Sequence, residues 1–340
     1  MKKIILIIVF TLISSTAFAY YPIPTSLSKL TKYFKKNNAE LIKISSYNGS
    51  FRRSDAYVNI RDGLYKKRPI EVDALMAFPK KGDGPFPVVI FVHASGGADL
   101  FSNEWFKFNR LAAKSLLKKG IAVMFLDNFS ARGQKNTYKN QTSIQHWSTF
   151  IDAFKALEYL SNDPRVNIKK IGITGWSRGG AISLMASEKR LRNELISADL
   201  YFAAAQPRSP PCWSIGMFVN PQPIKETKTW MVLGGADNFT LAKDCVLLGE
   251  KYKANGADIE VTVKKGWHHG FTANYKEEYE GDAAIFNDCP GSFTNDQGII
   301  IYEGNQSFPD CITRGATIGG NKGVVFKKPF LKFFTESLLN

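Results

Sequence analysis

Apolar and polar residues alternate along this chain in blocks that predict strands and helices in turn. Short blocks that are continuously apolar, or that alternate with a period of two, predict strands at residues 70–78, 88–92, 121–126, 170–174, 200–204, 229–233 and 259–263. Longer blocks predict helices at 105–118, 142–162, 241–253 and 329–339, and one more that ends near residue 190. This alternation indicates an α/β fold with a mostly parallel central sheet and helices on both faces.

The predicted helix at 142–162 combines several local signals. Thr142 and Gln145 fit a capping box at its start. Asp163-Pro164 is expected to end it, because a proline in a helix interior removes a backbone hydrogen bond. Its buried face is expected to carry residues at helical spacing: Ile144, Trp147, Ile151 and Phe154.

The N-terminal 19 residues have the features of a signal peptide. Lys2 and Lys3 precede an apolar run at 4–13, and small residues end at Ala17-Phe18-Ala19. An uncleaved anchor is the alternative, but the run is shorter than the ~20 residues that span a bilayer. We expect export to the periplasm or the outside, with no stable membrane insertion after cleavage.

We expect the mature chain, 20–340, to be a single domain. Residues 275–322 depart from the alternating pattern and are rich in Gly, Asn and Asp. This segment is expected to be an irregular excursion. Long irregular segments are often functional, and a surface insertion with no role in chemistry is an equally weighted alternative.

Charge and cysteines narrow the class of protein further. The net charge is +15, but the basic residues are scattered pairs without interleaved aromatics, which predicts a solvated basic surface and no nucleic-acid partner. The four cysteines contain no CxxC, so no zinc motif is present. Export favours two disulfides over free thiols, and among the three pairings we favour Cys212–Cys245 and Cys289–Cys311.

A Gly175-x-Ser177-x-Gly179 motif lies between a predicted strand and a predicted helix. That context predicts a nucleophile elbow, a tight turn that presents the Ser177 hydroxyl above the sheet. The helix start would direct the Arg178 N–H toward a developing oxyanion. The alternative without a catalytic role is an ordinary strand-to-helix turn.

A serine nucleophile needs a base and a carboxylate. The chain has four histidines, and the order serine, acid, histidine leaves only His268 and His269. We favour His269, because Gly270 lets its loop turn back. Asp237 follows a predicted strand between Ser177 and His269 and is the expected acid. Asp244 is its alternative.

Other roles remain open for several of these residues. Asp237 could instead cap the helix that starts near Thr240. A second oxyanion donor is expected from the backbone N–H of Ala94 or Ser95, in the loop after the strand at 88–92.

Together these motifs resemble the dienelactone-hydrolase-like branch of the α/β-hydrolase superfamily. The resemblance runs from about residue 88 to 271, through 93–97, 127–133, 175–180, 235–237 and 269–271. It implies a triad of Ser177, Asp237 and His269, with no metal and no organic cofactor. Family members that act on dienelactone use a cysteine nucleophile, so Ser177 favours ordinary esters. Ala94 replaces the family's usual glycine and could narrow the site.

Two further residues are candidates for binding substrate, Arg132 and Trp176. Arg132 matches a family position and could bind a carboxylate bidentately, but we favour a role in bracing its own loop. The overall prediction is an exported serine hydrolase that cleaves small-molecule or polymer-borne carboxylic esters or lactones through an acyl-enzyme. The alternatives are a peptidase or lipase of the same fold, or a non-catalytic binding protein.

Overall fold

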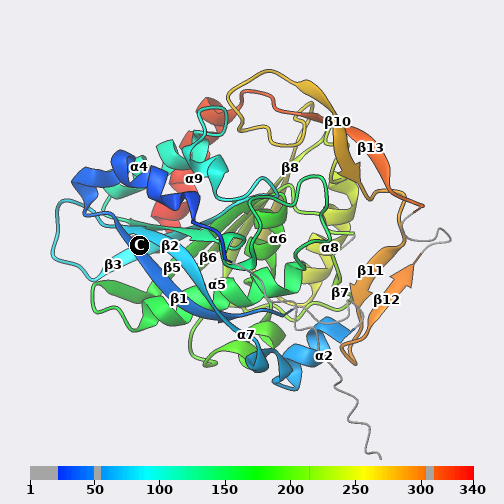
Figure 1. The fold of residues 1–340 in the computed structure, drawn as a ribbon, viewed down its shortest axis with the longest axis horizontal. Helices are drawn as coiled ribbons and strands as arrows, with labels where there is room; N and C mark the ends of the chain where they lie inside the picture. Colours follow the sequence, from blue (N-terminus) through cyan, green and yellow to red (C-terminus); the bar gives the residue numbers. More distant parts are fainter. Residues whose placement is uncertain (1–21, 50–54, 214, 304–309) are drawn as a thin grey trace, which may run out of the picture.

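The computed structural model describes residues 22–49, 55–213, 215–303 and 310–340 (Figure 1). The predicted signal peptide lies outside the described residues. Within them, no helix has both the length and the apolar character that a membrane span requires.

An eight-stranded sheet forms the centre of the molecule, in the order β1-β2-β4-β3-β5-β6-β8-β9. The pairings of β2 with β1 and with β4 are antiparallel, and the remaining pairs are parallel. Its strands are β1 (Glu40–Tyr47), β2 (Pro69–Ala77), β3 (Phe86–Val92), β4 (Ala122–Asp127), β5 (Val166–Trp176), β6 (Ala204–Arg208), β8 (Lys228–Gly234) and β9 (Ile259–Lys264). The mostly parallel sheet was predicted, whereas β1 was not.

Helices cover both faces of this sheet (Figure 1). Successive residues of β3 show how: Val88, Ile90 and Val92 enter one core and Val89 and Phe91 the other. The first core is closed by α5 (His146–Ser161), α6 (Arg178–Met185), α7 (Lys189–Leu195) and α8 (Ala242–Ala254). The second is closed by α4 (Phe108–Lys118), α9 (Gly323–Leu338) and N-terminal turns that include α1 (Thr31–Phe34). Two short helices, α2 (Ala56–Arg61) and α3 (Asp99–Ser102), lie between β1 and β2 and after β3.

Several predicted boundaries are wrong, for local reasons. The capping box does not form: α5 starts after Gln145, which makes no side-chain cap bond, and the Thr142 hydroxyl donates to Asn140. The helix after Ser177 stops at Met185, and Glu188 then has an extended backbone and caps a new helix by accepting from the Arg190 N–H.

Two other elements start at different residues than predicted. Strand β6 begins at Ala204, where the prediction at 200–204 ended. Helix α9 begins six residues before Pro329 and contains it. Pro329 and the residue four positions earlier, Val325, are both exposed, so the carbonyl that loses its partner at the proline lies near solvent.

The excursion at 275–322 is more regular than predicted. Strands β10 (Glu278–Ile285) and β13 (Thr313–Ile318) form an antiparallel pair, and β12 (Ile300–Glu303), β11 (Gly291–Thr294) and β7 (Met217–Phe218) form a second small sheet. Both sheets lie along one side of the molecule (Figure 1).

Two disulfides join the cysteine pairs that the sequence favoured. Cys212–Cys245 links the chain after β6 to α8, and Cys289–Cys311 closes a loop within the excursion.

Candidate active site

Ser177 lies on a sharp turn between β5 and α6. Its backbone has φ 56° and ψ −119°, a conformation that is strained for a residue with a side chain. The Ser177 N–H donates to the Arg208 carbonyl of neighbouring β6 at 2.9 Å, which holds the turn in place. The side chain is therefore presented at the carboxyl end of the sheet, as the motif predicted.

The glycines around Ser177 are required by close backbone contacts. A Cβ at Gly175 would lie 2.4 Å from the Gly179 carbonyl oxygen, and one at Gly179 would lie 2.5 Å from the Val92 carbonyl oxygen. These positions pack the start of α6 directly onto β3 and β5. Any side chain at either position would push the turn away from the sheet.

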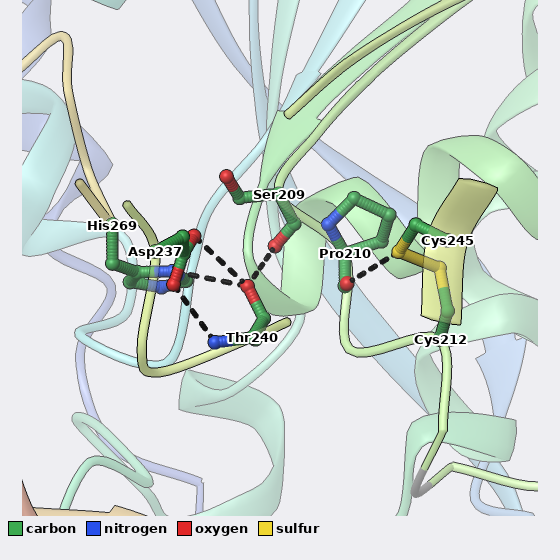
Figure 2. Close-up of a disulfide and its surroundings, with 7 residues drawn as sticks. All are labelled: Ser209, Pro210, Cys212, Asp237, Thr240, Cys245 and His269. Atoms are coloured by element: carbon green, nitrogen blue, oxygen red, sulfur yellow. Dashed lines mark hydrogen bonds and ion pairs between the residues drawn. A yellow bond between two sulfur atoms is a disulfide. The ribbon is translucent and has the colours of Figure 1, made fainter. Parts of the chain in front are cut away.

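Asp237 and His269 form a buried pair. Asp237 lies in the loop after β8, and His269 lies in the loop after β9. The His269 Nδ1 lies 2.8 Å from the Asp237 Oδ2, and both residues are almost fully buried (Figure 2). The other carboxylate oxygen, Oδ1, accepts from the Phe239 and Thr240 N–H groups at 2.9 and 2.8 Å. Asp237 thus holds its own loop and the imidazole at the same time.

Thr240 is a member of this network that the sequence did not single out. Its hydroxyl lies 3.1 Å from the Asp237 Oδ2, 3.1 Å from the Ser209 carbonyl and 3.2 Å from the His269 Nδ1 (Figure 2). The available signal was the three-residue spacing from Asp237, because an Asp that accepts from the N–H groups at i+2 and i+3 brings the i+3 residue beside it.

The loop that carries His269 depends on Gly270. Gly270 has φ 65°, and a Cβ there would lie 2.5 Å from the Trp176 ring. The His269 carbonyl also accepts from the Gly319 N–H at 2.8 Å, which ties this loop to the end of β13. His268 is not joined to the acid, and its Nδ1 has no partner among the described residues.

His93 has a structural role at the end of β3. Its Nε2 accepts from the Asn128 N–H at 3.0 Å, and its Nδ1 lies 2.9 Å from the Ala94 carbonyl. Burial lowers the pKa of His93, which favours the neutral ring that this pattern of one donor and one acceptor needs. His93 therefore fixes the loop that contains Ala94 and Ser95.

The candidate oxyanion donors lie around Ser177. In the described part of the chain, neither the Ala94 nor the Ser95 N–H donates to a backbone carbonyl. The Arg178 N–H is at the start of α6, where the helix dipole favours negative charge.

The Arg178 side chain braces this region. Its guanidinium donates to the Ile144 and Gln141 carbonyls at 2.9 and 2.6 Å, and the Ser95 hydroxyl donates to the Gln141 side chain at 2.7 Å. Burial lowers the pKa of Arg178 to about 9. The two loops that carry the candidate donors are thereby joined through Gln141.

Two cavities open beside Ser177. We call the first the His269 cavity; His269, Ser177, Ala94, Trp176, Tyr275 and Glu280 are among its lining residues. We call the second the disulfide cavity; Cys212, Ser177, Ile215, Phe239, Leu241 and Phe286 are among its lining residues. Asp244, the alternative acid, lines the disulfide cavity, whereas His269 lines the other.

The two candidate substrate-binding residues differ in position. Trp176 lines the His269 cavity, where its ring stacks on Phe106 with centroids 5.6 Å apart. Arg132 lines neither of the two cavities and is buried in a bidentate ion pair with Asp152, at 2.8 and 3.0 Å. It also donates to the carbonyl of Asn128, which agrees with the bracing role that we favoured.

A mostly parallel sheet with a serine on a sharp turn after its central strand defines an α/β-hydrolase. The sequence model of the dienelactone hydrolase family matches residues 72–286, and the chain belongs to that family. It is therefore a hydrolase that acts on ester bonds.

Solved structures with a related fold are distant in sequence. A provisionally assigned dienelactone hydrolase from Klebsiella pneumoniae is 17% identical, with a TM-score of 0.47 over 70% of this chain and 90% of that chain. A thermophilic esterase from Thermogutta terrifontis is 16% identical, with a TM-score of 0.46 over 60% of this chain and 80% of that chain.

Proposed function

We propose that this protein is an exported serine hydrolase that cleaves carboxylic esters through an acyl-enzyme on Ser177. The observation that carries the proposal is the buried 2.8 Å contact between the His269 Nδ1 and the Asp237 Oδ2, beside a cavity that Ser177 and His269 line together. A carboxylate on Nδ1 leaves Nε2 free to act as a base and stabilises the imidazolium that forms.

The reaction then runs in two halves. The His269 Nε2 takes the proton of the Ser177 hydroxyl as Oγ attacks the ester carbonyl, and the N–H groups of Arg178 and of Ala94 or Ser95 hold the oxyanion. The bond from the carbonyl carbon to the alcohol oxygen breaks, and that oxygen receives the proton from His269. Water, activated by the same imidazole, releases the acid and restores Ser177.

Export rests on the sequence features of residues 1–19 and on the cysteines. Two disulfides are expected in an oxidising compartment and are rare in the cytosol. We therefore place the mature protein in the periplasm or outside the cell. Mass spectrometry of the N-terminus, after expression in a secreting host, would find Tyr20 as the first residue.

The activity is tested with p-nitrophenyl esters of increasing acyl length. Ser177→Ala is expected to lower kcat by about 10⁴-fold or more. The matched control is Ser187→Ala, since Ser187 is also buried after α6, but its hydroxyl donates to the Leu184 carbonyl and it lines neither cavity. Full activity in Ser177→Ala would refute the nucleophile. Labelling of the wild type by a fluorophosphonate, without ester hydrolysis, would favour a peptidase, and absence of both would favour a binding protein.

A further inference from the structure

The two cavities meet at the nucleophile from different sides. They share four lining residues: Ser95, Gln141, Ser177 and Phe239. The disulfide cavity has a volume of about 190 Å³ and the His269 cavity about 650 Å³. An ester bound at Ser177 can therefore place its acyl group in one cavity and its alcohol group in the other.

The chemistry of the leaving group decides which cavity binds the acyl group and which binds the alcohol group. The alcohol oxygen must receive a proton from His269, so it has to lie within hydrogen-bond reach of that imidazole. Of the two cavities, only the larger is lined by His269. We propose that the His269 cavity binds the alcohol group of the ester and the disulfide cavity binds its acyl group. This inference rests on the proposed function.

The walls of the disulfide cavity suit an uncharged, apolar acyl chain. Its apolar lining includes Ile144, Trp147, Ile215, Leu241 and Phe286, and Cys212 places the Cys212–Cys245 disulfide in the wall. Figure 2 shows this disulfide on the opposite side of Thr240 from His269.

Charged groups in the disulfide cavity do not favour an anionic acyl group. The two terminal nitrogens of the Arg178 guanidinium already donate to backbone carbonyls, and its Nε has no partner among the described residues. Asp244 is half-buried, and burial raises its pKa, but when ionised it repels a second carboxylate. The smaller volume of this cavity favours short, unbranched acyl groups.

The His269 cavity has a different character. Its walls include the aromatic side chains of Trp105, Phe106, Tyr138, Trp176 and Tyr275. Flat aromatic walls bind rings, and they also attract cations through their π faces. The larger volume leaves space for a ring-bearing alcohol.

Carboxylates give this cavity a negative rim on a protein of net positive charge. Glu278 and Glu280 of β10 line it. Lys139, the one lysine among the described residues that line it, is paired with Asp282 at 2.7 Å. The alcohol group is therefore uncharged or cationic, and an anionic one is disfavoured. Through β10, the excursion supplies part of the specificity of the site.

The assignment can be tested with a matched pair of substitutions. Leu241 lines only the disulfide cavity and Leu100 only the His269 cavity, and both are partly exposed. Leu241→Trp is expected to lower the ratio of kcat/KM for hexanoate esters to kcat/KM for acetate esters about tenfold. This is the scale of a methylene-sized change in an apolar pocket. The corresponding ratio of naphthyl acetate to methyl acetate should not change. Leu100→Trp is expected to lower the ratio of naphthyl to methyl acetate and to leave the ratio of hexanoate to acetate esters unchanged. Leu241→Ala should raise the ratio of hexanoate to acetate esters.

A charge series tests the rim of the His269 cavity. The probes are phenyl acetates with a 3-trimethylammonio, 3-tert-butyl or 3-carboxy substituent, the first two being isosteres. The wild type should rank them in that order, and Glu278→Gln/Glu280→Gln should lower the ratio of cation to anion by about three- to tenfold.

The outcomes separate the two proposals. If Leu241→Trp changes the alcohol ratio and Leu100→Trp the acyl ratio, the assignment is reversed. If neither ratio moves in either variant, or the carboxy ester is preferred, the substrate class is wrong although the esterase stands. If the wild type hydrolyses no ester and Ser177→Ala changes nothing, the proposed function itself fails.

Discussion

The Thr240 hydroxyl offers a sharp test of how the acid is held. It contacts the Asp237 Oδ2 and the Ser209 carbonyl, each at 3.1 Å, within a buried site. Thr240→Val keeps the shape of the side chain and removes only the hydroxyl. Asp237 retains the N–H groups of Phe239 and Thr240 and the contact with His269, so the carboxylate stays paired.

The size of the effect follows from what is lost. A single hydroxyl proton serves either the carboxylate or the carbonyl, so the substitution removes one donated hydrogen bond. It also removes the oxygen that lies 3.2 Å from the His269 Nδ1, but that nitrogen keeps its shorter contact with Asp237. A hydrogen bond to a charged group is worth about 1.5–3 kcal/mol, and each 1.4 kcal/mol is tenfold in rate. Because the bond is shared between two acceptors, we expect the lower end, about a tenfold loss of kcat with KM little changed.

The assay measures kcat and KM on p-nitrophenyl acetate, together with denaturant unfolding. The Ser209 carbonyl loses its hydroxyl donor, so the free energy of unfolding should fall by about 1–3 kcal/mol. Thr240→Ser retains the hydroxyl and is expected to keep kcat within about threefold of the wild type. Wild-type kcat in Thr240→Val, or an equal loss in both variants, would refute the reasoning.

Two further substitutions test the bracing of the site. Arg132→Met leaves the buried Asp152 carboxylate without its ion pair. Urea unfolding should show a free energy of unfolding that is lower by about 3–5 kcal/mol, and KM should not change. A large rise in KM would show that Arg132 binds substrate instead. Gly179→Ala should lower the free energy of unfolding by about 1–3 kcal/mol and kcat on the order of 10²-fold, because its Cβ would lie 2.5 Å from the Val92 carbonyl oxygen. The control is Gly281→Ala, which has space around its Cβ and should match the wild type in both assays.

The central sheet was predictable because its signals are local. A parallel strand covered on both faces is apolar at every position, as β3 is, and such runs stand out in the sequence. The elbow was predictable for a similar reason: the glycines at 175 and 179 are needed by contacts within a few residues and the adjoining strand. The order of the acid and the base along the chain then restricted the choice to a few residues.

The excursion could not be read in the same way, because its order comes from distant partners. Strand β11 pairs with β7, where Phe293 lies opposite Met217, and β10 pairs with β13 across a disulfide-closed loop. Strands of four to eight residues with glycine and charged positions carry no periodic signal of their own. Their polar composition indicates a loop, although pairing satisfies their backbone groups.

Asp237 shows why the competing interpretations of one residue need not exclude each other. The sequence allowed either a helix cap or a catalytic acid, and a carboxylate has two oxygens. In the structure Oδ1 accepts from the backbone N–H groups of Phe239 and Thr240, as a cap would, while Oδ2 faces the His269 Nδ1. The cap-like bonds hold the carboxylate at a fixed angle, so the oxygen that faces the imidazole needs no further ordering during the reaction. Asp237→Asn has a single side-chain oxygen. If that oxygen keeps the backbone N–H groups, an N–H₂ group faces the His269 Nδ1, so the variant should preserve the fold and lose most of the activity.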